Sequence, residues 1–176
     1  MSEFISLYSG SSGNCSVVRT GEKYIIIDMG KGVRTTSAAL KELGLNISDC
    51  AGILVTHEHS DHVKGLATFL KKNPLPVYGA DDTLDFLDAN GIVPASCALR
   101  TLSGGEEDVG DFGVTMFPTN APFENIETAE HWLFAFHEHI PHRCPRKQML
   151  QTREVAEQWH THKHHLHRRL PVLSNL

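Results

Sequence analysis

The chain has 176 residues, of which 40% are hydrophobic and 21% charged, the balance of a soluble globular protein with one main core. Because the formal net charge is −5, we expect no broad cationic face for binding nucleic acid, although metal ions can supply positive charge to a phosphate substrate. No apolar run approaches the roughly 20 residues of a membrane span, and the first residues do not have the pattern of a signal peptide. The four cysteines form no C-x-x-C pair, so we expect reduced thiols and a cytoplasmic protein.

The first part of the chain is predicted to be rich in strands. Apolar patterns predict strands at 4–7, 16–19 and 24–28, and the glycine-serine turn 9–14 joins the first two. The third strand is nearly all apolar, so we expect it in the centre of a sheet that is covered on both faces. Asp28 ends this strand, where an unpaired buried carboxylate would be costly.

Helices and strands alternate after Asp28. Helical spacing predicts helices at 33–43, from Val63 to Leu70, and from a cap at Asp81 to Asp88. Further strands are predicted at 47–55, 77–79, 99–102 and 114–117, with a turn-rich stretch at 103–113. This alternation indicates an α/β fold.

Four strong metal ligands fall within six residues, directly after the apolar run 52–55. They are His57, His59, Asp61 and His62. His57 and His59 are two apart and can lean toward one ion, whereas Asp61 and His62 lie beyond it and suit a second ion. Three nitrogen donors and one oxygen suit Zn²⁺, Mn²⁺ or Fe²⁺. Two such ions would share a water, the nucleophile of a two-metal hydrolase, which Asp61 can orient or deprotonate. The alternative is a surface loop that is merely rich in histidine.

The spacing His-x-His-x-Asp-His resembles the signature of the metallo-β-lactamase fold superfamily, and residues 7–15 resemble the opening of its YycJ/WalJ branch of metal-dependent hydrolases. The resemblance covers about residues 4–118 and implies the first half of an αββα sandwich. It also implies two divalent metal ions and an Asp28 that helps to hold the metal loop without binding an ion. The segment Ser11, Ser12, Gly13 and Asn14 would form a loop beside the active site.

The resemblance further implies a phosphodiester substrate and nuclease action on DNA ends, to which composition does not point independently. Thioester or lactone hydrolysis on the same fold is an alternative. A histidine at position 59, in place of glutamate, argues against the diiron-oxidase branch. We expect no membrane partner, and the sequence does not define an oligomeric state.

Composition changes abruptly near Phe117. All 14 glycines lie at or before Gly113, no aspartate follows Asp111, and nine of the 12 histidines come later. We therefore divide the chain into a metallo-β-lactamase-like domain at 1–118 and a histidine-rich tail at 119–176, for which the sequence defines no fold. Family members would continue with a further histidine ligand, a bridging aspartate and another histidine. Since 118–122 holds no histidine and no aspartate remains, the second alternative is a catalytically incomplete fragment that binds metal weakly.

Two histidine groups of the tail could be mistaken for metal sites. His137, His139 and His142 repeat the spacing of the first motif, but Pro141 replaces its aspartate and removes the oxygen ligand. Five histidines at 160–167 are typical of a solvated helix face or a disordered end that binds Zn²⁺ or Ni²⁺ loosely.

Overall fold

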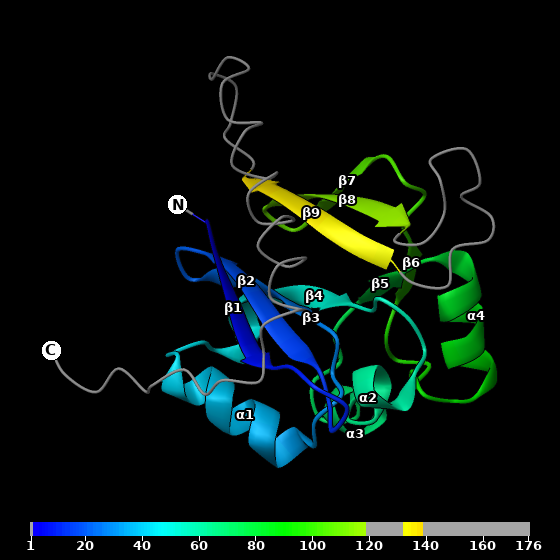
Figure 1. Ribbon diagram of the computed structural model, residues 1–176, viewed down its shortest axis with the longest axis horizontal. Coiled ribbons are helices and arrows are strands. Elements are labelled where there is room, and N and C mark those ends of the chain that lie inside the picture. Colours follow the sequence, from blue (N-terminus) through cyan, green and yellow to red (C-terminus); the bar gives the residue numbers. More distant parts are fainter. Residues whose placement is uncertain (1, 119–131, 139–176) are drawn as a thin grey trace, which may run out of the picture. The chain divides into compact units, whose positions relative to one another are not determined.

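The computed structural model describes residues 2–118 and 132–138. Within these residues the strands form two sheets, one with six strands and one with three (Figure 1). None of the described helices is long and apolar enough to cross a membrane. The remaining residues include most of the predicted tail, its cluster at 160–167, and His139 and His142. These predictions fall outside the described residues, and the boundary at residue 118 stays a prediction.

The larger sheet is antiparallel at one end and parallel at the other. Its strands, in spatial order, are β1 (Ser2–Tyr8), β2 (Cys15–Thr20), β3 (Lys23–Ile27), β4 (Cys50–Leu54), β5 (Val77–Gly79) and β6 (Leu99–Thr101). The strands from β1 to β3 pair antiparallel, and those from β3 to β6 pair parallel. The parallel strands are joined through α1 (Val33–Glu42), the 3₁₀ turn η1 (Ile47–Asp49), α2 (Ser60–Val63), α3 (Leu66–Leu70) and α4 (Asp81–Ala89).

The smaller sheet contains β7 (Glu106–Val109), β8 (Phe112–Pro118) and β9 (Trp132–Glu138). Its three strands are antiparallel, with β8 in the middle. β9 pairs antiparallel along the whole of β8.

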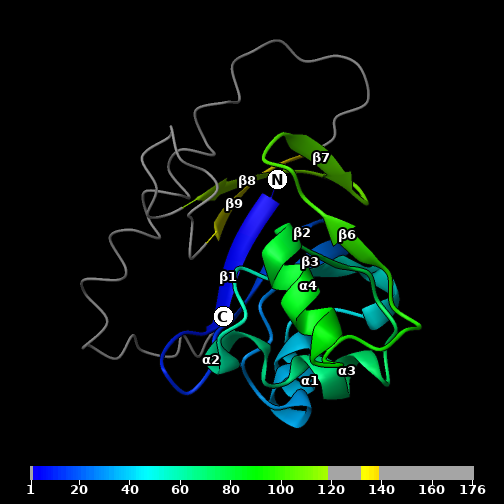
Figure 2. The same ribbon diagram turned by 90° about the vertical axis from the view of Figure 1, so that its right-hand side faces the viewer.

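The larger sheet is covered on both faces, as its apolar central strand predicts. Successive residues of a strand point to opposite faces, so Ile26 packs in a core with the helices and Ile25 in a core with the smaller sheet. In β4, Ile53 packs in the core with the helices and Leu54 in the core with the smaller sheet. Figures 1 and 2 show the helices on one side of the larger sheet and β7–β9 on the other. The described residues thus form a helix–sheet–sheet arrangement, three of the four layers of the predicted αββα sandwich.

Several element boundaries differ from the prediction. The predicted strand 47–55 begins with the turn η1, where Ile47 is exposed, and only Cys50–Leu54 join the sheet. The predicted helix after His62 begins earlier, at Ser60, and is interrupted before Leu66. Asp81 is not the cap of α4, because Ala80 holds that position without a side-chain hydrogen bond. Within the predicted turns at 103–113, β7 pairs with β8.

Three loops meet at the edge of the larger sheet where β1, β3 and β4 end. The amide N–H of Asn14, after β1, donates to the carbonyl oxygen of Asp61, after β4, at 2.7 Å. The N–H of Gly30, after β3, donates to the carbonyl oxygen of Asn14 at 2.8 Å, and that of Met29 donates to the carbonyl oxygen of His62 at 2.6 Å. Backbone hydrogen bonds therefore join the predicted site loop and the predicted metal turn.

Gly30 makes this close approach possible. A Cβ atom at Gly30 would lie 1.7 Å from the carbonyl oxygen of Asp61, far inside van der Waals contact. Gly32, two residues later, has an ordinary extended backbone (φ −63°, ψ 146°) and nothing within 4 Å of its own Cβ position.

We expect Gly30→Ala to lower the free energy of unfolding by about 2–3 kcal/mol or more, because the loops must separate to admit the methyl group. Gly32→Ala is the matched control, and we expect a change within about 0.5 kcal/mol. Urea denaturation of the two variants tests this. Equal stability of the two would contradict the proposed packing of the loops.

Candidate metal centre

The four predicted ligands follow β4, a strand buried between the helices and the smaller sheet. His57 is buried, with 8% of its surface exposed, whereas His59 is exposed and occupies the N-cap position of α2 without a side-chain hydrogen bond. Asp61 and His62 lie in the single turn of α2 and are partly exposed. The strand thus fixes one end of the turn, and the helix fixes the other.

The structure brings these four side chains together. The ring centroids of His57 and His62 are 3.9 Å apart, and those of His57 and His59 are 4.6 Å apart in an edge-to-face arrangement. Asp61 Oδ2 lies 3.6 Å from His62 Nε2. The predicted ligands therefore share one region and are not scattered over a surface loop.

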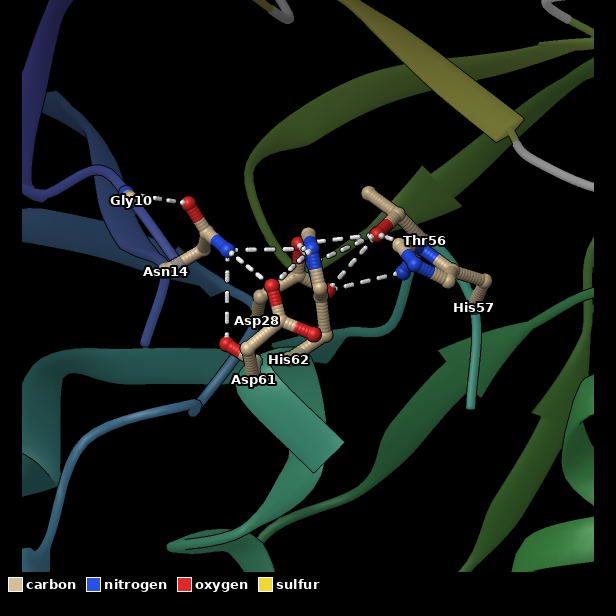
Figure 3. A network of polar contacts seen from close by, with 7 residues as sticks. All are labelled: Gly10, Asn14, Asp28, Thr56, His57, Asp61 and His62. Carbon is tan, nitrogen blue, oxygen red and sulfur yellow. Dashed lines mark hydrogen bonds and ion pairs between the residues drawn. The ribbon is translucent and has the colours of Figure 1, made fainter. Parts of the chain in front are cut away.

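Asp28 lies beneath this cluster and anchors it (Figure 3). Its carboxylate is buried and accepts hydrogen bonds from the Thr56 backbone N–H at 2.9 Å and the Thr56 hydroxyl at 2.8 Å. His62 Nδ1 is 2.6 Å from the same carboxylate. These contacts offset the cost of burying the charge, and they tie His62 to the end of β3. The predicted position of Asp28 beside the metal loop is what the structure shows, and its role toward a metal stays a proposal.

The Thr56 hydroxyl determines which nitrogen of His57 carries a proton. A carboxylate cannot donate, so the single hydroxyl hydrogen of Thr56 must go to Asp28. The Thr56 oxygen can then only accept from His57 Nδ1, which is 3.0 Å away. Nδ1 therefore carries a proton, and in the neutral ring Nε2 keeps the lone pair that a metal ligand requires.

Asn14 has the corresponding effect on His62. The backbone N–H of Gly10 donates to Asn14 Oδ1 at 3.0 Å, which turns the amide nitrogen toward the cluster (Figure 3). That nitrogen donates to Asp61 Oδ2 at 3.0 Å and lies 3.1 Å from His62 Nε2. Since an amide nitrogen only donates, Nε2 of His62 must accept, and Nδ1 carries the proton toward Asp28.

The other residues of the predicted site loop lie farther from these contacts. Ser12 is exposed and accepts a hydrogen bond from Lys31 Nζ at 2.7 Å, and Ser11 is exposed. Gly13 is buried, and a Cβ atom there would lie 2.5 Å from the carbonyl oxygen of Gly30. Of the four loop residues, Asn14 is the one whose side chain touches the predicted ligands in the described part of the chain.

Cys15 follows Asn14, but its side chain belongs to the core on the helix side. Burial raises the pKa of the Cys15 thiol to about 12, so the thiol stays protonated at neutral pH. Cys15 therefore does not present a thiolate to the cluster.

The donor atoms suit divalent metal ions as pairs. Two atoms bound to one zinc ion at tetrahedral angles are roughly 3.3–3.6 Å apart, and the separation of Asp61 Oδ2 from His62 Nε2 falls in that range. No group of three or more His, Cys, Asp or Glu side chains in residues 2–118 and 132–138 converges on one point as a formed site would. The described residues thus supply one measured ligand pair, Asp61 and His62, and the division of the four ligands between two ions stays a prediction.

Thr56 is the residue that the sequence analysis missed. It contacts Asp28, His57 and His62, yet a threonine at the end of a strand has no distinctive pattern. Its position immediately before the first histidine was the available signal, because residues next to ligands often orient them.

The sequence model that describes the metallo-beta-lactamase superfamily matches residues 8–124 of this chain. This range is more than half of the chain and includes all four candidate ligands. The chain belongs to the metallo-β-lactamase superfamily. Members of this superfamily typically bind divalent metal ions such as zinc, and the ligand pair described above suits such ions. The match ends a few residues beyond the predicted limit of the resemblance.

Relatives of this superfamily member include two exodeoxyribonucleases. Exodeoxyribonuclease YycJ of Bacillus anthracis is 38% identical over 135 residues, 76% of this chain and 49% of the relative. Exodeoxyribonuclease WalJ of Streptococcus pneumoniae serotype 2 is 31% identical over 117 residues, 62% of this chain and 44% of the relative. The chain spans about half the length of these curated relatives.

Solved structures show the same fold. Zn²⁺-bound PqqB from Methylobacterium extorquens superposes with a TM-score of 0.60 at 15% sequence identity, over 79% of this chain and 62% of that chain. The predicted α/β fold of the metallo-β-lactamase type is confirmed.

We expect Thr56→Val to lower the free energy of unfolding by about 1–3 kcal/mol, because the nearly isosteric side chain removes one of the three donors to the buried Asp28 carboxylate. Thr56→Ser keeps the hydroxyl and is the control, with a smaller loss. Urea denaturation of the metal-free protein, run with a chelator, separates this effect from metal binding. If the valine variant were as stable as the serine variant, the hydroxyl would have no anchoring role.

Proposed function

We propose that the protein is a metal-dependent hydrolase that cleaves phosphodiester bonds in nucleic acid. The observation that supports this proposal is that His57, His59, Asp61 and His62 lie in one region directly after β4. The similarity to two exodeoxyribonucleases supports a DNA substrate and attack at strand ends. The three cysteines of the described residues are free thiols, which supports a cytoplasmic location.

Each residue of the cluster has a proposed role. His57 and His59 would hold one divalent ion, and Asp61 and His62 a second, with Zn²⁺, Mn²⁺ or Fe²⁺ suited to these donors. When bound, such ions supply a water of lowered pKa and positive charge against the phosphoryl oxygens. Asp61, 32% exposed, faces solvent and can orient or deprotonate that water.

The remaining contacts would position these groups. Asp28 and Thr56 orient the rings of His57 and His62. One amide nitrogen of Asn14 donates to Asp61 Oδ2 and to His62 Nε2 and keeps these two atoms close together, and a bound ion would take the place of Asn14 at Nε2. We propose positioning roles for these three residues.

A second candidate is a chain that binds metal weakly and has no catalytic activity. Two observations favour it. The described residues supply one measured ligand pair and no converged group of three, and the chain spans about half the length of its curated relatives. Since an ion held by two protein ligands is easily removed, metal content separates the two candidates.

The test compares Asp61→Asn with Glu58→Gln, a carboxylate of the same turn to which we assign no role. The proteins are loaded with Zn²⁺ or Mn²⁺, dialysed against a mild chelator and assayed for metal by mass spectrometry. Turnover is then measured on bis(p-nitrophenyl) phosphate and on an end-labelled DNA strand. We expect the wild-type protein and Glu58→Gln to retain two ions and turn over both substrates, and Asp61→Asn to be slower by about 10²- to 10⁴-fold.

Other outcomes contradict the proposal. Less than one ion, lost on mild chelation, together with no turnover of either phosphodiester, would favour the weakly metal-binding chain. Turnover of a thioester or lactone but not of a phosphodiester would favour the ester-hydrolase alternative. An equal loss of turnover in Asp61→Asn and Glu58→Gln would contradict the role proposed for Asp61.

A further inference from the structure

An open groove of about 490 Å³ lies between the beginning of α1 and helix α3. Residues 32–35 form one wall, and Lys64, Gly65, Thr68 and Lys72 form the other. None of the candidate metal ligands lines it, so it is a separate surface of the same domain.

The groove concentrates positive charge on an acidic protein. Arg34, Lys64 and Lys72 line it, and no acidic side chain does. Residues 1–118 contain nine lysines and arginines against 15 acidic residues, so a third of the domain's cations meet here. All three side chains are exposed, and none forms an ion pair with another residue of the described ranges.

Both walls of the groove begin next to the candidate metal centre. Lys64 is two residues after His62, so their Cα atoms are at most about 7 Å apart. The N–H of Gly65 donates to the carbonyl oxygen of Met29 at 2.8 Å, and the N–H of Met29 donates to that of His62 at 2.6 Å. The loop that leads into α1 is thus held directly against the metal turn.

We propose that this groove binds the backbone phosphates of the nucleic-acid strand whose reacting phosphate lies at the metal centre. Successive phosphates of a duplex strand are about 3.4 Å apart along the helix axis, so the next few beyond the reacting one would come within reach of Lys64 and then of Arg34 and Lys72. Contacts of this kind position a strand and do not select a sequence. The inference rests on the proposed function, because it assigns a path to the substrate of the same site.

The test uses two triple variants of the full chain, each of which removes one arginine and two lysines. The groove variant is Arg34→Gln, Lys64→Gln and Lys72→Gln. The control variant is Lys41→Gln, Lys71→Gln and Arg100→Gln, three exposed cations outside the groove. The probe is a fluorescein-labelled single-stranded oligodeoxythymidine, with binding measured by anisotropy over a range of salt concentrations and with EDTA present.

We expect the groove variant to bind the strand about 10- to 100-fold more weakly than the wild-type protein at low salt, and its plot of log affinity against log salt to be shallower by about 2. The control variant should stay within about threefold of the wild type, apart from a general charge effect. All three proteins should have the same thermal transition, and loaded with metal they should turn over bis(p-nitrophenyl) phosphate equally.

The inference is overturned if the wild-type protein does not bind the strand, if the groove variant binds as tightly as the wild type, or if both variants weaken equally. Because binding is measured without metal, the inference and the proposed function can fail separately. Strand binding that depends on the groove, with no turnover of any phosphodiester, would contradict the proposed function alone. Turnover that survives with unchanged strand affinity in the groove variant would contradict this inference alone.

Discussion

The buried carboxylate of Asp28 is the contact on which the candidate centre depends. It accepts hydrogen bonds from the Thr56 backbone N–H, the Thr56 hydroxyl and His62 Nδ1, and each donor atom lies within 3.0 Å of a carboxylate oxygen. Asp28 reaches this position with a left-handed backbone (φ 60°), which costs an ordinary residue about 1–2 kcal/mol. Hydrogen bonds to a charged group contribute about 1.5–3 kcal/mol each and can offset that strain. The strain therefore lies where the arrangement of the site requires it.

The order of elements was predictable because apolar patterns in this chain are strong. Neighbouring residues of β3 (Ile25 and Ile26) and of β4 (Ile53 and Leu54) pack in opposite cores. An uninterrupted run of apolar residues is typical of a strand that is covered on both faces. The errors occurred where local pattern and tertiary context disagree. Ile47 looks like a strand residue but lies in an exposed turn, and the acidic residues of β7 look like a loop but pair with β8.

The candidate ligands were predictable because they are close in sequence, whereas the groups that orient them come from other loops. Asn14 reaches Asp61 and His62 across 47 and 48 positions, and no spacing rule links them. The basic groove is likewise formed by residues that are distant in sequence. Net charge argued against a broad cationic face, and the three cations that meet in the groove come from α1 and from the segment around α3. Composition cannot detect charges that only the fold brings together.

The two residues that connect β4 to His57 are both fixed by hydrogen bonds from their backbone N–H groups. Val55 N–H donates to the carbonyl oxygen of Tyr78, and Thr56 N–H donates to Asp28, so the chain is held up to the residue before the first histidine. Gaining or losing one residue here would invert which face each following side chain occupies. Length variation among natural homologues should therefore avoid this stretch and accumulate at open turns such as Gly104–Gly105, where an added Cβ atom would meet nothing closer than 4.0 Å.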